Sequence, residues 1–136
     1  MTVDNELSRA ETNRRTVLEL YRRFNAGDLD GAFALVHEDF VTHNPRVPHD
    51  PAASTGKQAF RDFFGTPAGR ALAAARQEVM RVVADDDLVA VHIRLAMGEA
   101  VNAVVDLLRL RDGVIVEHWD VVQPVPDRLP HPHGML

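Results

Sequence analysis

The sequence predicts an α+β fold, in which helices from the first half of the chain pack on one face of a curved β-sheet formed by the second half. Apolar residues recur at helical spacing through about residue 75, and the pattern changes to strand-like segments after it. Four such segments follow one another across short turns, which is typical of an antiparallel meander covered by helices.

The length and charge of the chain limit its class. Its 136 residues suit one domain spanning residues 1–136, and its net charge of -5 argues against nucleic acid as a partner, since phosphates need a basic surface. The absence of cysteine excludes disulfides, thiolate catalysis and zinc–thiolate sites. No apolar run is long enough to cross a membrane, and the polar N-terminus lacks a signal core. We therefore expect a cytoplasmic protein with no membrane partner.

Start and stop signals place the helices. Ser8 followed by Glu11 fits a capping box, and Gly27 and Asp28 suit the end of this helix and the start of a shorter one. A proline-rich loop is expected over residues 45–55, a helix over 57–64 and another short helix over 67–75. The shorter second helix is expected to hold Ala32, Phe33, Leu35 and Val36.

Strands are expected where β-branched and apolar residues dominate. A short strand over residues 40–44 ends at Pro45, and four longer strands follow over 78–84, 88–97, 101–110 and 114–123. The tail beyond them contains prolines that lack a ladder donor, so it cannot be a central strand. His131 and His133 lie in this tail and are expected to be solvated.

Ionisable and amide side chains interrupt these apolar strands. Burying one unpaired costs on the order of 1–3 kcal/mol, so such groups are best tolerated around one cavity, where they satisfy one another and address a ligand. In the last strand, His118 and Asp120 point to one side, whereas Glu117 and Trp119 point to the other side with Ile115. The candidates for such a cavity are His43, Asn44, His92, Asp106, His118 and Asp120.

The turn before the last strand decides which of these residues meet. A two-residue turn at Asp112-Gly113 would pair Leu110 with Ile115 and Asp106 with Trp119, on the face opposite to Asp120. A three-residue loop that includes Arg111 would instead pair Asp106 with His118, and Val104 with Asp120. We expect the second register, because it gathers Asp106, His118 and Asp120 on one face.

These three residues form a plausible acid–base site. A carboxylate desolvated in an apolar pocket becomes a stronger base, and a nearby imidazolium opposes that change. Asp120 is therefore the candidate general base, tuned by His118 or Asp106. Imidazole and carboxylate ligands also suit zinc, iron or nickel, although the sequence contains no compact ligand motif such as HExxH.

Two segments resemble a known superfamily. NAGDLDGAFALVHEDFVTHNP (residues 25–45) resembles the entry of ketosteroid isomerases, and VVDLLRLRDGVIVEHWDVVQPVP (residues 104–126), with the final HGML, resembles SnoaL-like polyketide cyclases. Both belong to the nuclear transport factor 2-like superfamily. The resemblance implies a cone-shaped, cystatin-like sheet with helices closing a deep pocket, chemistry without a cofactor or metal, and a homodimer formed through the convex sheet face.

The resemblance also implies roles for single residues. In the cyclases, an aspartate on the last strand is the base for aldol ring closure, and Asp120 matches it. The base of the isomerases stands just before a proline on the first strand, where this chain has Asn44, which cannot accept a proton. Tyr21 matches the isomerases' oxyanion tyrosine.

The expected function is cofactor-independent acid–base chemistry on a carbonyl small molecule, as in a cyclase, isomerase or aldol-type lyase. A hydrolase or dehydratase of the same fold, and a binding protein without chemistry, are the alternatives. The expected catalytic residues are Asp120, His118 and Asp106, and the expected substrate-binding residues are Tyr21, His43, Asn44, His92 and Trp119.

Overall fold

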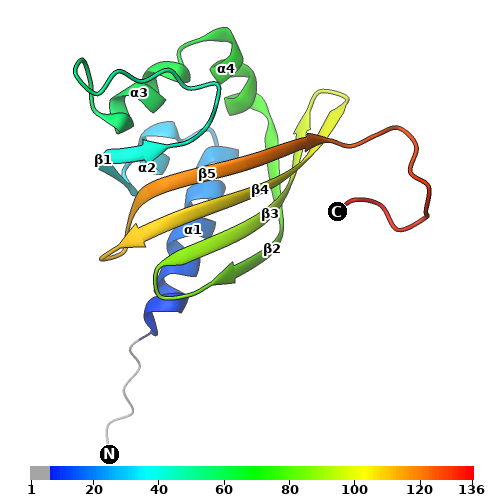
Figure 1. Ribbon diagram of the computed structural model, residues 1–136, viewed down its shortest axis with the longest axis horizontal. Coiled ribbons are helices and arrows are strands. Elements are labelled where there is room, and N and C mark those ends of the chain that lie inside the picture. Colours follow the sequence, from blue (N-terminus) through cyan, green and yellow to red (C-terminus); the bar gives the residue numbers. More distant parts are fainter. Residues whose placement is uncertain (1–6) are drawn as a thin grey trace, which may run out of the picture.

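The computed structural model describes residues 7–136 and confirms the α+β class (Figure 1). No helix within these residues is both long and apolar enough to cross a membrane. The helices are α1 (Arg9–Asn25), α2 (Leu29–Phe33), α3 (Gly56–Phe63) and α4 (Pro67–Ala74). The strands are β1 (Val36–Thr42), β2 (Arg76–Ala84), β3 (Leu88–Met97), β4 (Ala100–Arg111) and β5 (Val114–Pro124).

The five strands form one mixed sheet in the order β1-β5-β4-β3-β2. β2 to β5 form the expected antiparallel meander, whereas β1 joins its edge parallel to β5. This parallel pair brings the end of β1 beside the centre of β5, with Thr42 opposite His118. Two segments that are about 75 residues apart in the chain thus contribute to one place in the sheet.

The predicted caps are confirmed at the first two helices. Ser8 accepts a hydrogen bond from the Glu11 amide, and Asp28 accepts one from the Gly31 amide. Gly27 has the positive φ of 76° that suits glycine after a helix. The expectation that the second helix holds Leu35 and Val36 was wrong. α2 ends at Phe33, and Val36 begins β1 because it pairs with Ile115.

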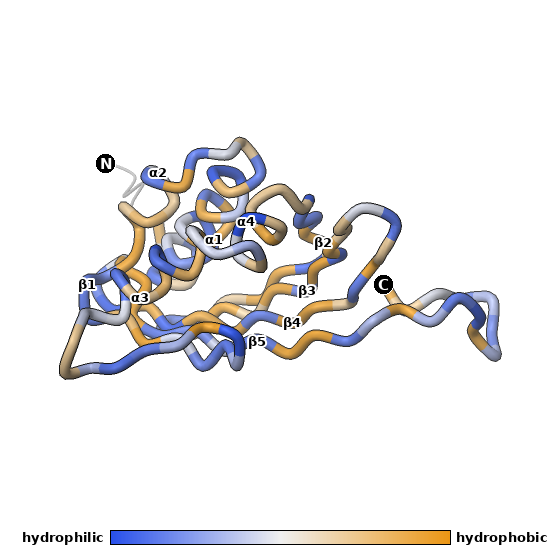
Figure 2. Tube along the Cα trace, turned by 90° about the horizontal axis from the view of Figure 1, so that it is seen from above, coloured by the Kyte–Doolittle hydropathy of each residue, from blue (hydrophilic) through white to orange (hydrophobic). Residues whose placement is uncertain are grey.

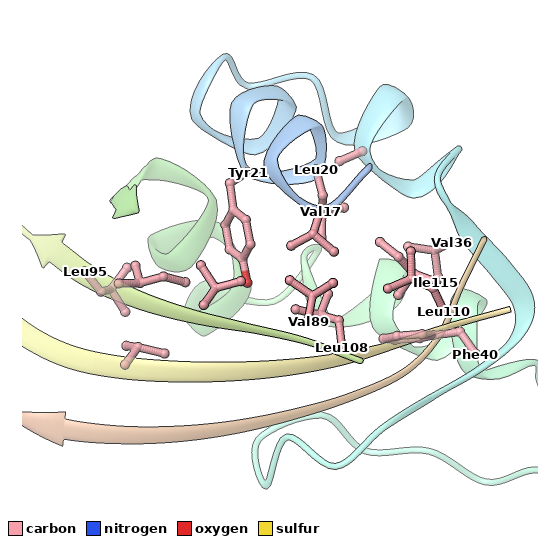
Figure 3. Packing of buried hydrophobic residues seen from close by; sticks show 14 of the residues in the cluster. Val17, Leu20, Tyr21, Val36, Phe40, Val89, Leu95, Leu108, Leu110 and Ile115 are labelled. Atoms are coloured by element: carbon pink, nitrogen blue, oxygen red, sulfur yellow. The ribbon is translucent and has the colours of Figure 1, made fainter. Parts of the chain in front are cut away.

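All four helices lie on one side of the sheet (Figure 2). α1 packs across β2 and β3, and α3 packs against β1. Figure 3 shows Val17 and Leu20 of α1 directed at Val89 and Leu108 of the sheet, with Tyr21 beside them. Val17 and Val89 are fully buried, so this contact anchors the first helix to the middle of the sheet.

The hairpin between β4 and β5 differs from both registers considered from the sequence. Asp112 and Gly113 have positive φ values of 52° and 77°, so the turn has two residues and the expected three-residue loop was wrong. Leu110 accordingly faces Ile115. A β-bulge then follows at Val116, and beyond it Arg109 faces Glu117.

The bulge changes which residues share a face. Asp106 lies directly opposite Asp120, not opposite His118, and Val104 lies opposite Val122. The extra residue also turns Ile115, which is 1% exposed, to the same side as His118. The expectation that Ile115 lies beside Trp119 on the outer face was therefore wrong.

A glycine allows α3 to lie close to β1. A Cβ atom on Gly56 would meet the carbonyl oxygen of Phe40 at 1.6 Å, a separation that no side chain tolerates. The close approach brings Phe60 of α3 into parallel stacking on Phe40 of β1, with ring centroids 5.8 Å apart. This pair of rings forms one wall of the cavity described below.

We predict that Gly56→Ala destabilises the protein by about 2–4 kcal/mol, because α3 must move away from β1 to relieve overpacking. Gly98→Ala is the control: it also adds a methyl group, but into open space, and its cost is limited to about 1–2 kcal/mol for a left-handed backbone. Urea unfolding of both variants measures the difference. Equal stabilities of the two variants would contradict the close packing of α3 on β1.

Candidate active site

A cavity of about 330 Å³ lies between the helices and the concave face of the sheet. Its size is in the range of small-molecule sites. Apolar side chains from all four helices and from the sheet make most of its wall. The polar side chains that line it are Tyr21, Asn44, Arg46, Gln77, Asn102, Asp106, His118 and Asp120. The prediction that Asp106, His118 and Asp120 share one concave cavity is confirmed.

Asp106 holds two of these groups together. Its side chain is 6% exposed, and the Tyr21 hydroxyl donates a hydrogen bond to its Oδ2 atom. Its Oδ1 atom lies 3.4 Å from Nε2 of His118. On the other side of the imidazole, Nδ1 of His118 lies 3.1 Å from Oγ1 of Thr42. Both ring nitrogens of His118 are thus occupied, which fixes the orientation of the ring.

The charges in this network follow from its burial. Desolvation, assisted by the Asp106 carboxylate, raises the pKa of Tyr21 well above 10, so its hydroxyl remains protonated. Burial alone would lower the pKa of His118, but Asp106 and Asp120 together raise it above 6.5. The site therefore favours an imidazolium at His118, paired with a carboxylate at Asp106.

Asp120 is held by only one of its two oxygen atoms. Nδ2 of Asn44 donates to its Oδ2 atom at 3.0 Å. Its Oδ1 atom is buried and has no hydrogen-bond partner, and it is the only such side-chain atom found within residues 7–136. Burial raises the pKa of Asp120 above 3.8, Asp106 acts in the same direction, and His118 and Arg46 oppose it. The carboxylate thus has one free oxygen atom and increased basicity.

Asn44 has a defined orientation. Its Oδ1 atom accepts a hydrogen bond from the backbone amide of Arg46 at 2.8 Å, so its NH₂ group must face Asp120. One of the two N–H groups binds Asp120, and the second is left for a ligand in the cavity. The sequence placed Asn44 correctly at the cavity, as a side chain that cannot itself be the base.

Phenylalanine rings form the apolar wall beside these groups. His118 stacks near Phe40 and Phe60, with ring centroids 6.3 Å away in both cases. Phe33, Phe63 and Phe64 form a second, buried cluster against Phe60. The aromatic side chains of α3 are therefore both core and cavity wall, and they keep water away from one side of His118.

Three residues expected at the site lie elsewhere. His92 alternates with the buried Val91 and Ile93, so it points to the outer face, where its Nδ1 atom lies 2.9 Å from Nη1 of Arg81. His43 lies outside the cavity and stacks on Trp119 with ring centroids 5.0 Å apart. The substrate-binding roles expected for His43, His92 and Trp119 at this cavity are therefore corrected.

The outer cluster around Trp119 is held by charges. Nε2 of His43 lies 2.9 Å from Glu117, and Arg109 lies over the Trp119 ring and contacts the same Glu117. The hydrogen bond from His43, followed by that from Arg109, lowers the pKa of Glu117. The polar residues of this outer face thus satisfy each other.

Sequence reasoning missed Gln77 and Asn102 of the cavity lining, and it also missed Thr42 and Arg46. Thr42 was not singled out, although its side chain contacts both His118 and the Asn44 amide. Arg46 was read as part of a loop, although it lines the cavity near Asp120. The available signal was their position: both stand two residues from Asn44, at the end of the first strand.

A metal centre was also considered from the sequence. Across residues 7–136, no three histidine, aspartate or glutamate side chains are arranged as ligands for a metal ion. The contacts of Asp106 and His118 are made instead to Tyr21, Thr42 and each other.

The fold and the cavity define the structural class of this protein: a curved mixed sheet whose concave face and covering helices enclose a cavity. The chain belongs to the SnoaL-like domain family, whose model matches residues 17–118. The match ends two residues before Asp120, so the family assignment does not depend on that residue. No curated protein matches the sequence.

Solved structures share the fold across most of their length. A candidate ketosteroid isomerase from Kribbella flavida DSM 17836 has a TM-score of 0.70 at 20% identity, covering 96% of this chain and 92% of that one. IdmH, a candidate polyketide cyclase from Streptomyces antibioticus, has a TM-score of 0.65 at 25% identity, covering 82% and 91%. AclR, a candidate hydroxylase from Streptomyces galilaeus, has a TM-score of 0.65 at 23% identity, covering 84% of this chain and 90% of that one. These names differ in chemistry, so the fold alone does not define the reaction.

We predict that Asp106→Asn lowers the pKa of His118, because the variant removes the carboxylate that stabilises the imidazolium and keeps an acceptor for Tyr21. In the wild type, this raised pKa stabilises the folded state fully below about 6.5, and the contribution is lost as the pH rises through the raised value. The stability difference between the two proteins should therefore shrink as the pH rises.

An NMR titration of the His118 ring, with urea unfolding at several pH values, measures both effects. A wild-type His118 that titrates at or below about 6.5, or a value unchanged in Asp106→Asn, would contradict the pairing of these two residues.

Proposed function

We propose that this protein is an enzyme of acid–base chemistry on a carbonyl compound, of the cyclase or isomerase type, with Asp120 as the general base. The observation that supports this most directly is that Asp120 lines the cavity with a carboxylate whose buried Oδ1 atom has no hydrogen-bond partner. Burying a carboxylate oxygen without a hydrogen bond is unfavourable, so a carboxylate with only a structural role is expected to have both oxygen atoms hydrogen-bonded. A base must instead keep one oxygen atom available for the substrate proton.

The proposed step is removal of a proton from the carbon next to a carbonyl group. The C–H bond breaks, its proton moves to Oδ1 of Asp120, and its electron pair forms the enolate, whose charge lies on the carbonyl oxygen. Return of the proton from Asp120 to another carbon gives an isomer. Attack of the enolate carbon on a second carbonyl of the same molecule instead forms a ring and breaks that C=O π bond, and the resulting alkoxide takes the proton back from Asp120. Neither route needs a cofactor, because the proton is only transferred and no electron is gained or lost overall.

The enolate oxygen needs a donor close to the base. The second N–H of Asn44 is suited to this role, since the first N–H already binds Asp120. A donor directed at the developing negative charge typically contributes about 3 kcal/mol to the transition state. In contrast, the Tyr21 hydroxyl donates to Asp106, so we assign Tyr21 to positioning Asp106 rather than to the oxyanion.

His118 and Asp106 influence the pKa of Asp120 through their charges. A cation at His118 would stabilise the ionised form of Asp120 before reaction and so limit the rise in its pKa. Asp106 in turn holds His118 in its charged form. We propose that these two residues adjust the basicity of Asp120 and do not themselves contact the reacting atoms.

We predict that Asp120→Asn lowers enzyme-catalysed proton exchange by at least about 10²-fold, the usual scale of general-base catalysis. The probe is 2-tetralone, a bicyclic ketone whose α-protons exchange with deuterium in D₂O and are followed by NMR. Asp86→Asn in the exposed β2–β3 turn is the matched control and should exchange as the wild type does. Thermal unfolding checks that both variants are folded.

Two results would contradict the proposal. Wild-type-like exchange in a folded Asp120→Asn variant would assign the base to another residue. Exchange by the wild type at the rate of the buffer alone would instead favour a binding protein without chemistry.

We also propose a homodimer formed through the outer face of the sheet. Val83, Val105, Leu107 and Val121 are 70%, 42%, 39% and 69% exposed. They are joined by strand pairing, since Val105 faces Val121 and Leu107 faces Trp119. A continuous apolar patch of this kind is unusual on a monomer, and a second copy of the same face would cover it symmetrically.

We predict that wild-type protein has the mass of a dimer in light scattering at micromolar concentration, and that Val121→Asp shifts it towards the monomer by burying a charge in the interface. Leu7→Asp is the control, because Leu7 is also exposed but lies before α1 and outside the sheet. A monomeric wild type would contradict the dimer.

A further inference from the structure

We propose that Arg46 anchors a negatively charged oxygen of the substrate at the mouth of the cavity, so that the substrate is an anionic carbonyl compound such as a keto acid with a planar or aromatic body. This inference rests on the proposed function for the choice of a carbonyl substrate. Its basis in the structure is the distribution of charge along the cavity.

The cavity has a polar inner part and a mouth without carboxylates. Three cross-strand pairs of β4 and β5 line the cavity in succession from its inner end. These pairs are Asp106 with Asp120, Val104 with Val122, and Asn102 with Pro124. Both aspartates that line the cavity belong to the first pair. The last pair contributes the side-chain amide of Asn102, and Gln77 adds a second amide to the lining. An anionic group is thus repelled at the inner end and meets no like charge among the residues of the mouth.

Arg46 is the only arginine or lysine among the residues that line this cavity. Asn44 holds Asp120, and Arg46 follows it in a turn in which the Val47 amide donates to the Asn44 carbonyl oxygen. Arg46 is exposed whereas Asp120 is partly buried, so Arg46 lies on the solvent side of the carboxylate. It is close enough to lower the pKa of Asp120 by its charge, yet within residues 7–136 its guanidinium forms no ion pair or side-chain hydrogen bond.

Within residues 7–136, Arg22 and Arg109 bind carboxylates away from the cavity, whereas Arg76 and Arg94, among others, form no ion pair either. Arg46 differs from all of them in its position, because it is the only arginine that lines the cavity. A guanidinium has five N–H donors that match a carboxylate in geometry, so a free one beside an apolar cavity is a suitable anchor for an acidic ligand. The chain as a whole has a charge of -5, and the cation at His118 is already paired with Asp106, so such a ligand gains its attraction mainly at Arg46.

The arrangement also orients the substrate. If Arg46 holds the anionic end, the rest of the molecule enters between the phenylalanine side chains of the cavity and the pair Val104 and Val122. The carbon to be deprotonated then lies towards Oδ1 of Asp120, and its carbonyl oxygen lies towards Asn44. Fixing one end in this way reduces the orientations that must be lost before reaction.

The test compares two probes that differ in charge and by one methyl group: 6-hydroxy-2-naphthoate and its methyl ester, whose binding is followed by naphthol fluorescence. Wild-type protein should bind the acid more tightly than the ester by about 10-fold, as expected for a charge-assisted contact that is partly open to solvent. Arg46→Met should abolish this preference and leave ester binding within about 2-fold, since it removes the charge and keeps the length. Arg46→Lys should restore part of the preference.

Two further measurements separate a specific anchor from a general effect of charge. Arg15→Met changes the net charge equally but lies in an exposed ion pair on α1, so it should preserve the preference for the acid. Raising the ionic strength from about 0.05 to about 0.5 M should weaken acid binding and leave ester binding unchanged.

The preference for the acid must depend on Arg46 for the inference to hold. An equal acid-to-ester ratio in wild type and Arg46→Met would overturn it, and so would the absence of binding of either probe. This test needs no turnover, so it is independent of the proton-exchange experiment. If Asp120→Asn abolishes proton exchange while Arg46→Met leaves the acid-to-ester ratio unchanged, the proposed function is supported and the role of Arg46 is contradicted. If Asp120→Asn exchanges as the wild type does while Arg46→Met loses the preference for the acid, the cavity binds acids but Asp120 is not its base.

Discussion

The site depends on one irregularity, the β-bulge at Val116 in β5. A regular strand would place Ile115 and His118 on opposite faces, because their separation of three residues is odd. The extra residue removes this conflict, so the same strand gives Ile115 to the core below α2 and then His118 and Asp120 to the cavity. It also sets Asp106 opposite Asp120, and the edge strand β1 then brings Thr42 and Asn44 to the same place.

The two aspartates at the centre of this arrangement have different hydrogen-bond partners. Asp106 is saturated by Tyr21 and by the imidazolium of His118, as expected of a carboxylate that supports a fold and a charge. Asp120 has one partner, Asn44, and one free oxygen atom. The sequence resemblance to ketosteroid isomerases implies a base just before Pro45, whereas that position holds Asn44, whose side chain donates to Asp120 on another strand.

Much of the fold and part of the candidate site could be predicted from the sequence, and each feature that could not be predicted has a physical cause. The caps at Ser8 and Asp28 and the span of β3 depend on local patterns, and the structure confirms them. The parallel pairing of β1 and the bulge depend on contacts between distant segments, which no local pattern encodes. Asp106, His118 and Asp120 were grouped correctly although the register used to group them was wrong, because the bulge compensates for the shorter turn. His92 was misplaced although strict alternation with Val91 and Ile93 indicates its outward direction.

The geometry of the site depends most directly on the register between β4 and β5, which places Asp106 opposite Asp120 in the cavity. Cross-strand nuclear Overhauser effects in a uniformly labelled sample measure this register directly. The structure predicts contacts between Asp106 and Asp120 and between Leu110 and Ile115, with Val116 left without a partner on β4. Contacts that pair Asp106 with Trp119 instead would show a regular hairpin without the bulge, turn Asp120 away from Asp106, and contradict the site as described.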